Sequence, residues 1–275
     1  MTKNVSGHLS KMVVELATPV NYYLPLDDER VLLNDYLGQR ISLNYAGEIH
    51  CCHCGRKTKK SFNQGFCFPC LKKLARCDSC IVSPEKCHYE QGTCREPEWG
   101  ETFCLTDHVV YLANSSGIKV GITRATQLPT RWIDQGAVQA LPIMRVATRL
   151  QSGLVEDALR QHVADKTNWR KMLKGEIEAV DLASTRDDLF ERCQSELTAL
   201  NERFGLQALL PVTDAKCVDI EYPVLEYPTK VSSQNFDKTP LVEGTLMGIK
   251  GQYLILDTGV INMRKFTAYN ISFAA

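Results

Sequence analysis

The chain has 275 residues, and its formal net charge is zero because 32 Lys and Arg residues balance 32 Asp and Glu residues. This balance excludes attraction to nucleic acid or anionic membranes through overall charge, so any such binding must come from local patches. The compositional outlier is the count of twelve cysteines.

The cellular compartment decides how these cysteines are interpreted. The stretch from Met1 to Pro19 lacks the uninterrupted apolar core of a signal peptide, and no segment approaches the roughly 20 apolar residues of a membrane span. We therefore expect a cytoplasmic protein with no membrane partner. Thiols stay reduced in that compartment, and clustered cysteines there bind metal more often than they form disulfides.

Residues 1–50 are predicted to form a β-rich N-terminal segment, because short extended runs such as Ile41 to Tyr45 are broken by proline, aspartate and glycine. Residues 51–104 are instead rich in cysteine, lysine, proline and glycine and contain few aliphatic side chains. Such a segment cannot build a core alone and needs cross-links. We see no internal repeat in the sequence.

Two C-x2-C pairs separated by twelve residues open the cysteine-rich segment, and their members are Cys51, Cys54, Cys67 and Cys70. Each pair places two thiolates on one tight turn, and two such turns complete a tetrahedron around zinc with Zn–S bonds of about 2.3 Å. Gly55 follows the first pair, where a knuckle turn favours a residue that tolerates positive φ. We predict a Zn(Cys)4 site of the ribbon or knuckle type, with Cys52 as a bystander.

A third C-x2-C pair opens a second group, whose simplest ligand set is Cys77, Cys80, Cys87 and Cys94. Cys104 or His108 could replace one of these ligands. A redox-active dithiol is the competing interpretation, but that function requires one reactive pair at a helix start in a βαβ frame. Three pairs crowded into one short segment favour one or two structural zinc ions.

The charged side chains from Cys51 to Arg76 are all basic, and Phe62, Phe66 and Phe68 are interleaved with them. Four thiolates and one Zn2+ contribute a charge of minus two, so this module remains positive. Small zinc modules hold nucleic acid by phosphate attraction and aromatic stacking. We predict DNA or RNA as a partner, and the contacting residues would be Lys57, Lys59 and Lys60. The alternative is a solvated basic face.

Residues 105–175 are predicted to form a compact core that opens with a β-hairpin. Val109 to Ala113 has the composition of a buried strand, Asn114 to Gly117 that of a turn, and Ile118 to Ile122 that of the returning strand.

Helices are predicted after this hairpin. Pro129 suits the first turn of a short helix, and Ser152 could cap a second one. Residues 176–205 predict a third helix, which begins at about Ser184. Residues 206–275 are predicted to be β-rich, forming a small antiparallel sheet or barrel that could bind a protein partner.

The hairpin and the helices carry a resemblance to a known family. The run Val109-Val110-Tyr111, the run Lys119-Val120-Gly121, Arg131 and Glu156 together resemble the GIY-YIG endonuclease superfamily, in its compact phage-type branch. The resemblance covers residues 108–173 and implies a small three-stranded antiparallel sheet flanked by helices. The whole chain also resembles a bacterial family that joins a cysteine-rich segment to such a core.

The resemblance implies hydrolysis of phosphodiesters with a single divalent ion. Tyr111 would orient or deprotonate the attacking water, and Gly121 would allow close backbone approach beside it. Arg131 would hold the scissile phosphate, and Glu156 would bind Mg2+ or Mn2+. The sequence departs from the family pattern at Lys119, which replaces the second motif tyrosine and could instead contact phosphate.

The sequence therefore predicts an α+β protein with a zinc-ribbon or knuckle segment, a GIY-YIG-like core and β-rich terminal regions. The leading function is metal-dependent cleavage of nucleic acid. The alternatives are a zinc-containing nucleic-acid-binding protein with an inactive nuclease fold, and a zinc-stapled adaptor that binds proteins.

Overall fold

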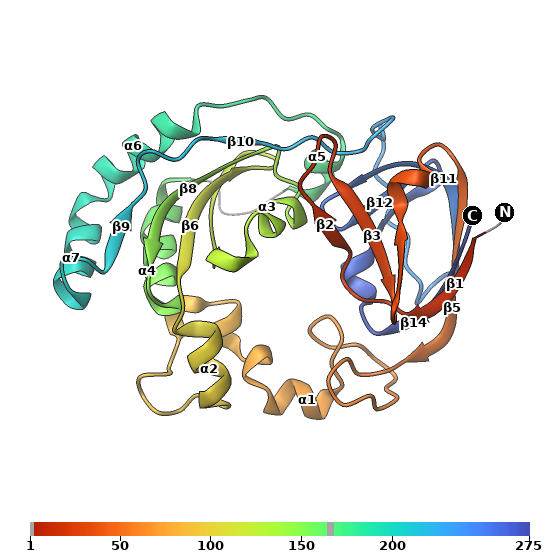
Figure 1. Ribbon diagram of the computed structural model, residues 1–275, viewed down its shortest axis with the longest axis horizontal. Helices are drawn as coiled ribbons and strands as arrows, with labels where there is room; N and C mark the ends of the chain where they lie inside the picture. Colours follow the sequence, from red (N-terminus) through yellow and green to blue (C-terminus); the bar gives the residue numbers. More distant parts are fainter. Residues whose placement is uncertain (1–2, 164–167) are drawn as a thin grey trace.

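The computed structural model describes residues 3–163 and 168–275, and its fold is α+β with antiparallel sheets. Three parts surround a central gap in the ribbon (Figure 1). The two ends of the chain build a sheet region on one side, a cysteine-rich segment crosses below, and a core of sheet and helices lies on the other side. Within the described ranges, no helix has the length and apolar character needed to cross a membrane.

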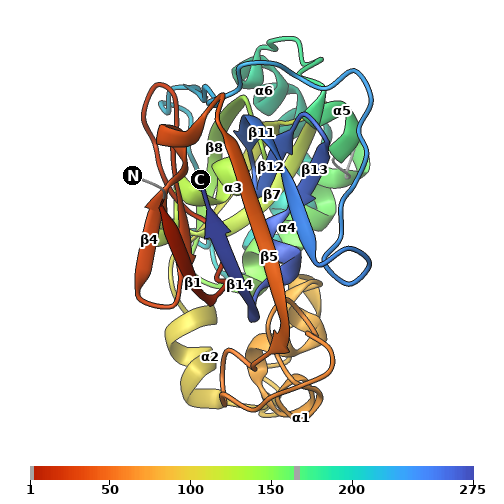
Figure 2. The same ribbon diagram turned by 90° about the vertical axis from the view of Figure 1, so that its right-hand side faces the viewer.

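The sheet region, which we call the terminal β-domain, contains strands from both ends of the chain. These strands are β1 (Asn4–His8), β2 (Val13–Glu15), β3 (Asn21–Leu26), β4 (Glu29–Leu32), β5 (Arg40–Ile49), β11 (Leu241–Lys250), β12 (Tyr253–Leu256), β13 (Gly259–Asn262) and β14 (Tyr269–Ala274). One sheet has the order β1-β14-β5-β11-β12-β13, and β2, β3 and β4 form another. Figure 2 shows β1, β14 and β5 side by side. The sequence analysis treated the two ends as separate segments, and the structure joins them in one sheet.

The terminal β-domain contains an internal repeat that the sequence analysis missed. Strands β3, β4 and β5 with the 3-10 helix η1 (Leu33–Tyr36) recur as β12, β13 and β14 with η7 (Met263–Phe266). The hairpin registers match residue for residue: the pairs are Tyr23–Leu32 and Leu26–Glu29 in the first copy, and Tyr253–Asn262 and Leu256–Gly259 in the second. The two copies meet where β5 pairs with β14. Leu43 and Phe273 are equivalent residues of the two copies and pair with each other, so an approximate two-fold axis relates the copies at this pair.

Strands β1 and β11, which pair with the last strands of the two copies, carry equivalent glycines. A Cβ atom on Gly7 would lie 2.8 Å from Asp27 Oδ2, and one on Gly244 would clash with Asp257 Oδ1. Both aspartates follow the first strand of their copy, so the glycines leave room for equivalent turns. The copies also share the pattern Tyr-Leu-x-Leu-Asp at 23–27 and 253–257 and Ile-Ser at 41–42 and 271–272, which the sequence analysis overlooked.

The cysteine-rich segment has little regular structure. Its helices are α1 (Phe68–Lys73), α2 (Pro97–Cys104) and the 3-10 turns η2 (Ala75–Cys77), η3 (Ser79–Ile81) and η4 (Pro84–Lys86). Few apolar side chains are buried along it, as the composition predicts.

The core confirms the predicted hairpin, because β6 (His108–Asn114) and β7 (Ile118–Arg124) pair antiparallel. The remaining elements are α3 (Thr130–Asp134), β8 (Gln139–Val146), α4 (Arg149–Leu159), α5 (Trp169–Leu173), α6 (Leu182–Arg192), α7 (Gln194–Phe204), β9 (Leu209–Pro211) and β10 (Val218–Asp219). Strand β6 lies between β7 and β8, and β9 and β10 extend the sheet at β8. The predicted three strands are therefore part of a five-stranded sheet in which β7 is an edge strand.

Two helix boundaries differ from the predictions. Helix α4 begins after Thr148, which forms a capping box with Gln151, so Ser152 lies inside the helix. The predicted third helix is two helices, since α6 ends and α7 begins at Cys193, whose ψ of 18° interrupts the helical backbone.

The core contacts the terminal β-domain through a continuous cluster of buried apolar side chains, which includes Ile133 and Leu254, and through one buried carboxylate. Asp134, at the end of α3, accepts from Lys11 Nζ at 2.6 Å and from Gln252 Nε2 at 2.8 Å. The Asp134 side chain is 5% exposed, so these two donors replace its water shell.

The core contacts the cysteine-rich segment through α4. A Cβ atom on Gly153 would lie 2.5 Å from the backbone nitrogen of Glu85 and 2.6 Å from the carbonyl carbon of Pro84. Only glycine lets α4 approach η4 this closely. Nearby, Arg149 Nη2 donates to the carbonyl oxygen of Ile81 at 2.6 Å.

We expect Gly153→Ala to destabilise the chain by about 1–3 kcal/mol, because the added methyl meets backbone atoms that cannot rotate away. Asp157→Ala on the same helix removes an exposed side chain and should change the free energy of unfolding by no more than about 0.5 kcal/mol. Urea unfolding of both variants measures the difference. Equal stability of the two would contradict the close docking of α4 on η4.

Candidate functional site

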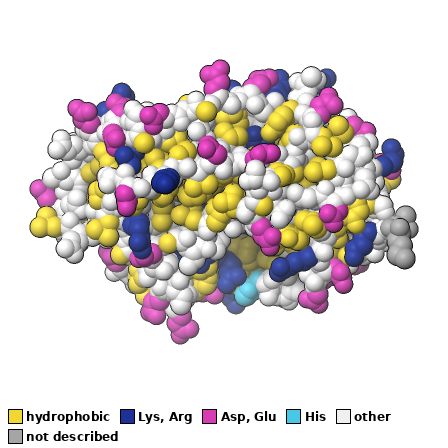
Figure 3. All heavy atoms as spheres, turned by 45° about the horizontal axis from the view of Figure 1, so that its top comes forward, with side chains coloured by type: hydrophobic (Ala, Val, Ile, Leu, Met, Phe, Trp, Pro, Cys, Tyr) yellow, Lys and Arg dark blue, Asp and Glu magenta, His cyan; other side chains and the backbone are white. Residues whose placement is uncertain are grey.

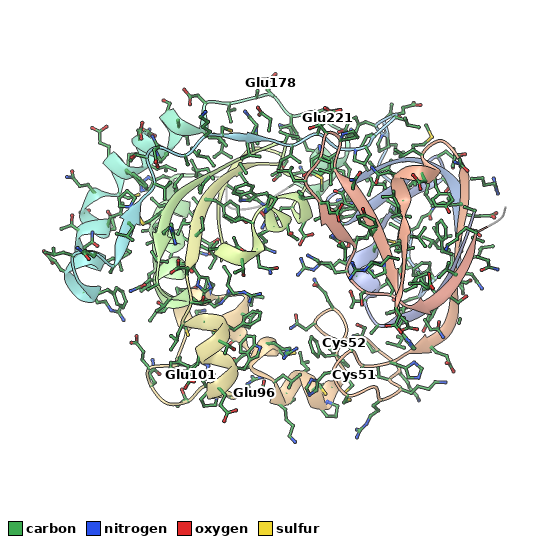
Figure 4. The ribbon with its side chains drawn as sticks, viewed as in Figure 1. Cys51, Cys52, Glu96, Glu101, Glu178 and Glu221 are labelled. Carbon is green, nitrogen blue, oxygen red and sulfur yellow. The ribbon has the colours of Figure 1, made fainter. Side chains whose placement is uncertain are left out.

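Four thiols converge where β5 enters the cysteine-rich segment, at the position of Cys51 in Figure 4. The ligand atoms of the predicted set, Cys51, Cys54, Cys67 and Cys70, all lie within 4.8 Å of one another. The sulfur atoms of Cys54 and Cys67 are 3.7 Å apart. A tetrahedron with Zn–S bonds of about 2.3 Å has edges of about 3.8 Å. The cluster is compatible with a structural zinc ion.

The local backbone favours ionised sulfur in this cluster. Burial opposes ionisation of the Cys51 thiol, but hydrogen bonds from the backbone at Cys54, Cys67 and His53 outweigh burial and lower the pKa of Cys51 to about 6. Gly55 has a φ of 68°, as the predicted knuckle turn requires. The neighbouring Cys52 is exposed and is not a member of the cluster.

The predicted basic face of this module is exposed. Lys57 forms an ion pair with Glu48 at 2.5 Å, which offsets part of its charge. Lys60 Nζ lies 5.4 Å from the ring centroid of Phe62, and this ring is 5.6 Å from that of Phe68. Phe68 is 52% exposed and could stack on a base, whereas Phe66 packs on the thiol cluster.

The other cysteines of the segment are arranged differently from the prediction. Cys77, which the sequence placed in the second ligand set, packs against the first cluster. Cys104 lines a small cavity together with the three remaining members of that set, Cys80, Cys87 and Cys94. His108 is buried at the start of β6, where its Nδ1 is 2.6 Å from the carbonyl oxygen of Thr106.

A cleft of about 520 Å³ lies between the three parts of the molecule. The core, the terminal β-domain and the cysteine-rich segment all line it. Its charged lining consists of six cations and two carboxylates: Lys11, Lys119, Arg124, Arg131, Arg149, Arg264, Asp134 and Glu156.

A second hollow of about 290 Å³ shares Lys11 and Arg264 and extends toward Arg76 and Phe66. In the space-filling view, Lys and Arg side chains flank a hollow in the lower middle of the face (Figure 3). Lys57, Lys59 and Lys60 are not among the residues that line the cleft.

Gly121 and Arg131 line the cleft, and Tyr111 is buried beside both of them. Tyr111 and Gly121 are cross-strand neighbours, and a Cβ atom at Gly121 would lie 2.7 Å from the Tyr111 hydroxyl. This hydroxyl donates to Gln135 Oε1 at 3.0 Å and also contacts Arg131. Burial raises the pKa of Tyr111, and the Arg131 guanidinium offsets part of that rise. Tyr111 itself is fully buried.

Glu156 lines the same cleft from α4, close enough to Tyr111 to influence its hydroxyl. Arg149 lies two turns earlier on α4 and lines the cleft as well. The sequence analysis missed Arg149, although its spacing of seven residues from Glu156 puts both on one helical face. Arg264 was also missed, and no local pattern links it to the core.

Cations crowd one another along this cleft. Arg264 is close enough to Arg131, and Arg124 close enough to Arg149, for each pair to repel electrostatically. The pKa of Arg264 and the pKa of Arg124 are both lowered, mainly by burial and to a smaller extent by this repulsion. Like charges gathered in a cleft are unfavourable in the free protein and become favourable when an anion binds.

Comparison with known proteins gives one match. A family model described as "Protein of unknown function (DUF2797)" matches residues 38–271, which include the thiol cluster and all the charged residues that line the cleft except Lys11. Searches of curated proteins and of solved structures return no match.

We expect the purified chain to retain zinc after desalting, and Cys70→Ser to lose one zinc ion and to unfold at a lower temperature. Ligation of zinc by this cluster would contribute directly to folding free energy, which explains both effects. Cys52→Ser, on the same loop but outside the cluster, should keep the zinc content and the melting temperature of the wild type. Elemental analysis with thermal denaturation measures both quantities. A wild-type chain that folds without any thiophilic metal would contradict the assignment.

Proposed function

This chain belongs to the DUF2797 family, and we propose that it binds nucleic acid in the central cleft and hydrolyses a phosphodiester bond there with a divalent cation. The convergence of Arg131 and Glu156 on one cation-lined cleft, with Tyr111 buried behind Gly121 of its lining, carries the proposal. The resemblance of the core to GIY-YIG endonucleases supports it, because that family uses these residue types in this order. Zinc bound by the thiol cluster would stabilise the cysteine-rich segment, which lines one side of the cleft.

Binding would depend chiefly on phosphate neutralisation. Six cations against two carboxylates leave the cleft lining strongly positive although the whole chain is neutral. Asp134 is neutralised by Lys11, and Glu156, which also lines the cleft, would interact with a bound divalent cation. Arginine side chains donate in a planar fork that matches phosphate oxygens. The exposed Phe68 would add a stacking surface outside the cleft.

Glu156, Arg131 and the buried Tyr111 would have separate roles in cleavage. Glu156 would hold Mg2+ or Mn2+, since a single carboxylate plus substrate phosphate and water suits these hard cations. The bound cation would supply charge neutralisation for the leaving group. Arg131 would hold the scissile phosphate. Tyr111 would orient water or phosphate through its hydroxyl rather than act as a base, because burial raises its pKa.

One observation favours a second candidate, binding without cleavage. Tyr111 is fully buried, and Lys119 stands where the resembled family has a second tyrosine. A site without an accessible phenol would still bind phosphate through its arginines. Absence of cleavage by the wild type on single-stranded, duplex and branched DNA and RNA, with tight binding retained, would support this second candidate.

We expect Glu156→Gln to bind nucleic acid as the wild type does and to lose cleavage, because the carboxylate is needed only to hold the catalytic cation. Cleavage by the wild type should require Mg2+ or Mn2+ and stop when EDTA is added. The matched control is Asp157→Asn, which changes the next carboxylate on α4, where it pairs with Arg160 at the surface. Cleavage that survives in Glu156→Gln would show that the site is wrong.

We expect Arg264→Ala to weaken binding about equally for all sequences and to reduce the salt-dependence slope by about one, because one phosphate contact is removed. Arg264 lines the cleft, where its Nε donates to Gln64 Oε1 at 2.6 Å. Lys265→Ala removes the next cation along the chain, which is exposed and does not line the cleft. Fluorescence anisotropy over a series of salt concentrations compares the two. Equal slopes would exclude the terminal β-domain from the binding surface.

A further inference from the structure

We propose a second zinc site formed by Cys80, Cys87, Cys94 and Cys104, distinct from the cluster at the end of β5. The four thiols line one cavity of about 10 Å³. A cavity of this size holds about one water-sized particle, so it suits a single ion and excludes an organic ligand. The proposal does not depend on whether the central cleft cleaves nucleic acid.

The thiols of this set interact with one another. A hydrogen bond joins Cys104 to Cys87, and Cys80 is close enough to Cys87 and Cys94 for their charges to interact. Cys104 is 5% exposed, at the end of α2. Cys80, Cys87 and Cys94 are half-buried. Four free cysteines that line one cavity match the ligand number and chemistry of structural zinc.

A different ligand set is the main competitor. Ligand atoms of Asp78, Cys80 and His88 lie within 4.8 Å of one another, which is tighter than the spacing of the four thiols. Asp78, however, accepts from Arg95 Nε at 2.6 Å and from the backbone nitrogen of Ser79, and His88 Nδ1 is 2.8 Å from Thr93 Oγ1. Two of these three groups therefore already have partners, and the thiols offer the softer ligands that zinc favours.

The surroundings suit the charge of the proposed site. Four thiolates and one Zn2+ carry a net charge of minus two. Arg149 lies close enough to Cys80 and Cys104 to interact with their charges, and Arg124 close enough to Cys104. These two cations would balance the site. The same two side chains line the central cleft, so the second metal would lie directly behind the cleft wall.

Zinc at the second site would stabilise a segment of the chain that buries few apolar side chains. From Ala75 to Cys104 the chain consists of three 3-10 turns and one short helix, with few buried apolar side chains to hold them. Ile81 follows ligand Cys80 directly, and its carbonyl oxygen receives Arg149. Zinc at this site would fix Ile81 and, through it, the position of Arg149 in the cleft.

The test is the metal content of the full chain and of paired cysteine variants, measured by elemental analysis. The wild type should hold two zinc ions. Cys104→Ser and Cys87→Ser should each hold one, whereas Cys77→Ser and His88→Ala should keep two. Substitution with Co2+ should give a thiolate-to-metal absorption that falls by about half in Cys104→Ser and is unchanged in Cys77→Ser.

Native mass spectrometry of the wild type counts the ions directly, so the test does not depend on whether a variant folds. A wild-type chain with one zinc ion would overturn the proposal. Loss of the second ion in Cys77→Ser or His88→Ala, with Cys104→Ser unaffected, would overturn the ligand set. Loss of nucleic-acid cleavage plays no part in these measurements.

Discussion

The carboxylate of Asp134 connects the parts of the molecule on which the cleft depends. It lies one turn after Arg131 on α3 and is held by Lys11 and Gln252 of the terminal β-domain. Gln252 in turn exchanges hydrogen bonds with the backbone of Met12, so the contact is tied into both ends of the chain. A buried carboxylate is stable only when its donors are in place. These hydrogen bonds and the shared apolar cluster therefore hold the core, which carries Arg131, against the terminal β-domain, which carries Arg264.

Local patterns predicted the elements that carry the chemistry. The β6–β7 hairpin follows from two apolar runs and a turn, and the approach of Gly121 to Tyr111 follows from their cross-strand pairing. The first thiol cluster follows from C-x2-C spacing, because each pair closes within a single turn. The start of α4 at Thr148 could also have been found, since Thr148 and Gln151 form a capping box.

Non-local features could not be predicted in the same way. Strand β5 pairs with β11 and β14, which lie at the other end of the chain, and no local pattern specifies that pairing. Arg264 enters the cleft only because of it. The position of Cys77 shows the same limit: sequence spacing grouped it with Cys80, but the chain turns between them and takes Cys77 to the first cluster. The sequence analysis named Cys104 only as an alternative ligand of the second set, and the fold brings it beside Cys87.

The split terminal β-domain has a consequence for the order of folding. The core contacts are mostly local, so α3, α4 and the β6 sheet can form as soon as their residues leave the ribosome. The sheet around β5 must wait for β14, which follows the whole core in the sequence. Until then β5 has an unpaired edge, and the side of the cleft that carries Arg264 has not formed. Vectorial synthesis therefore completes the cleft only after the core has been made.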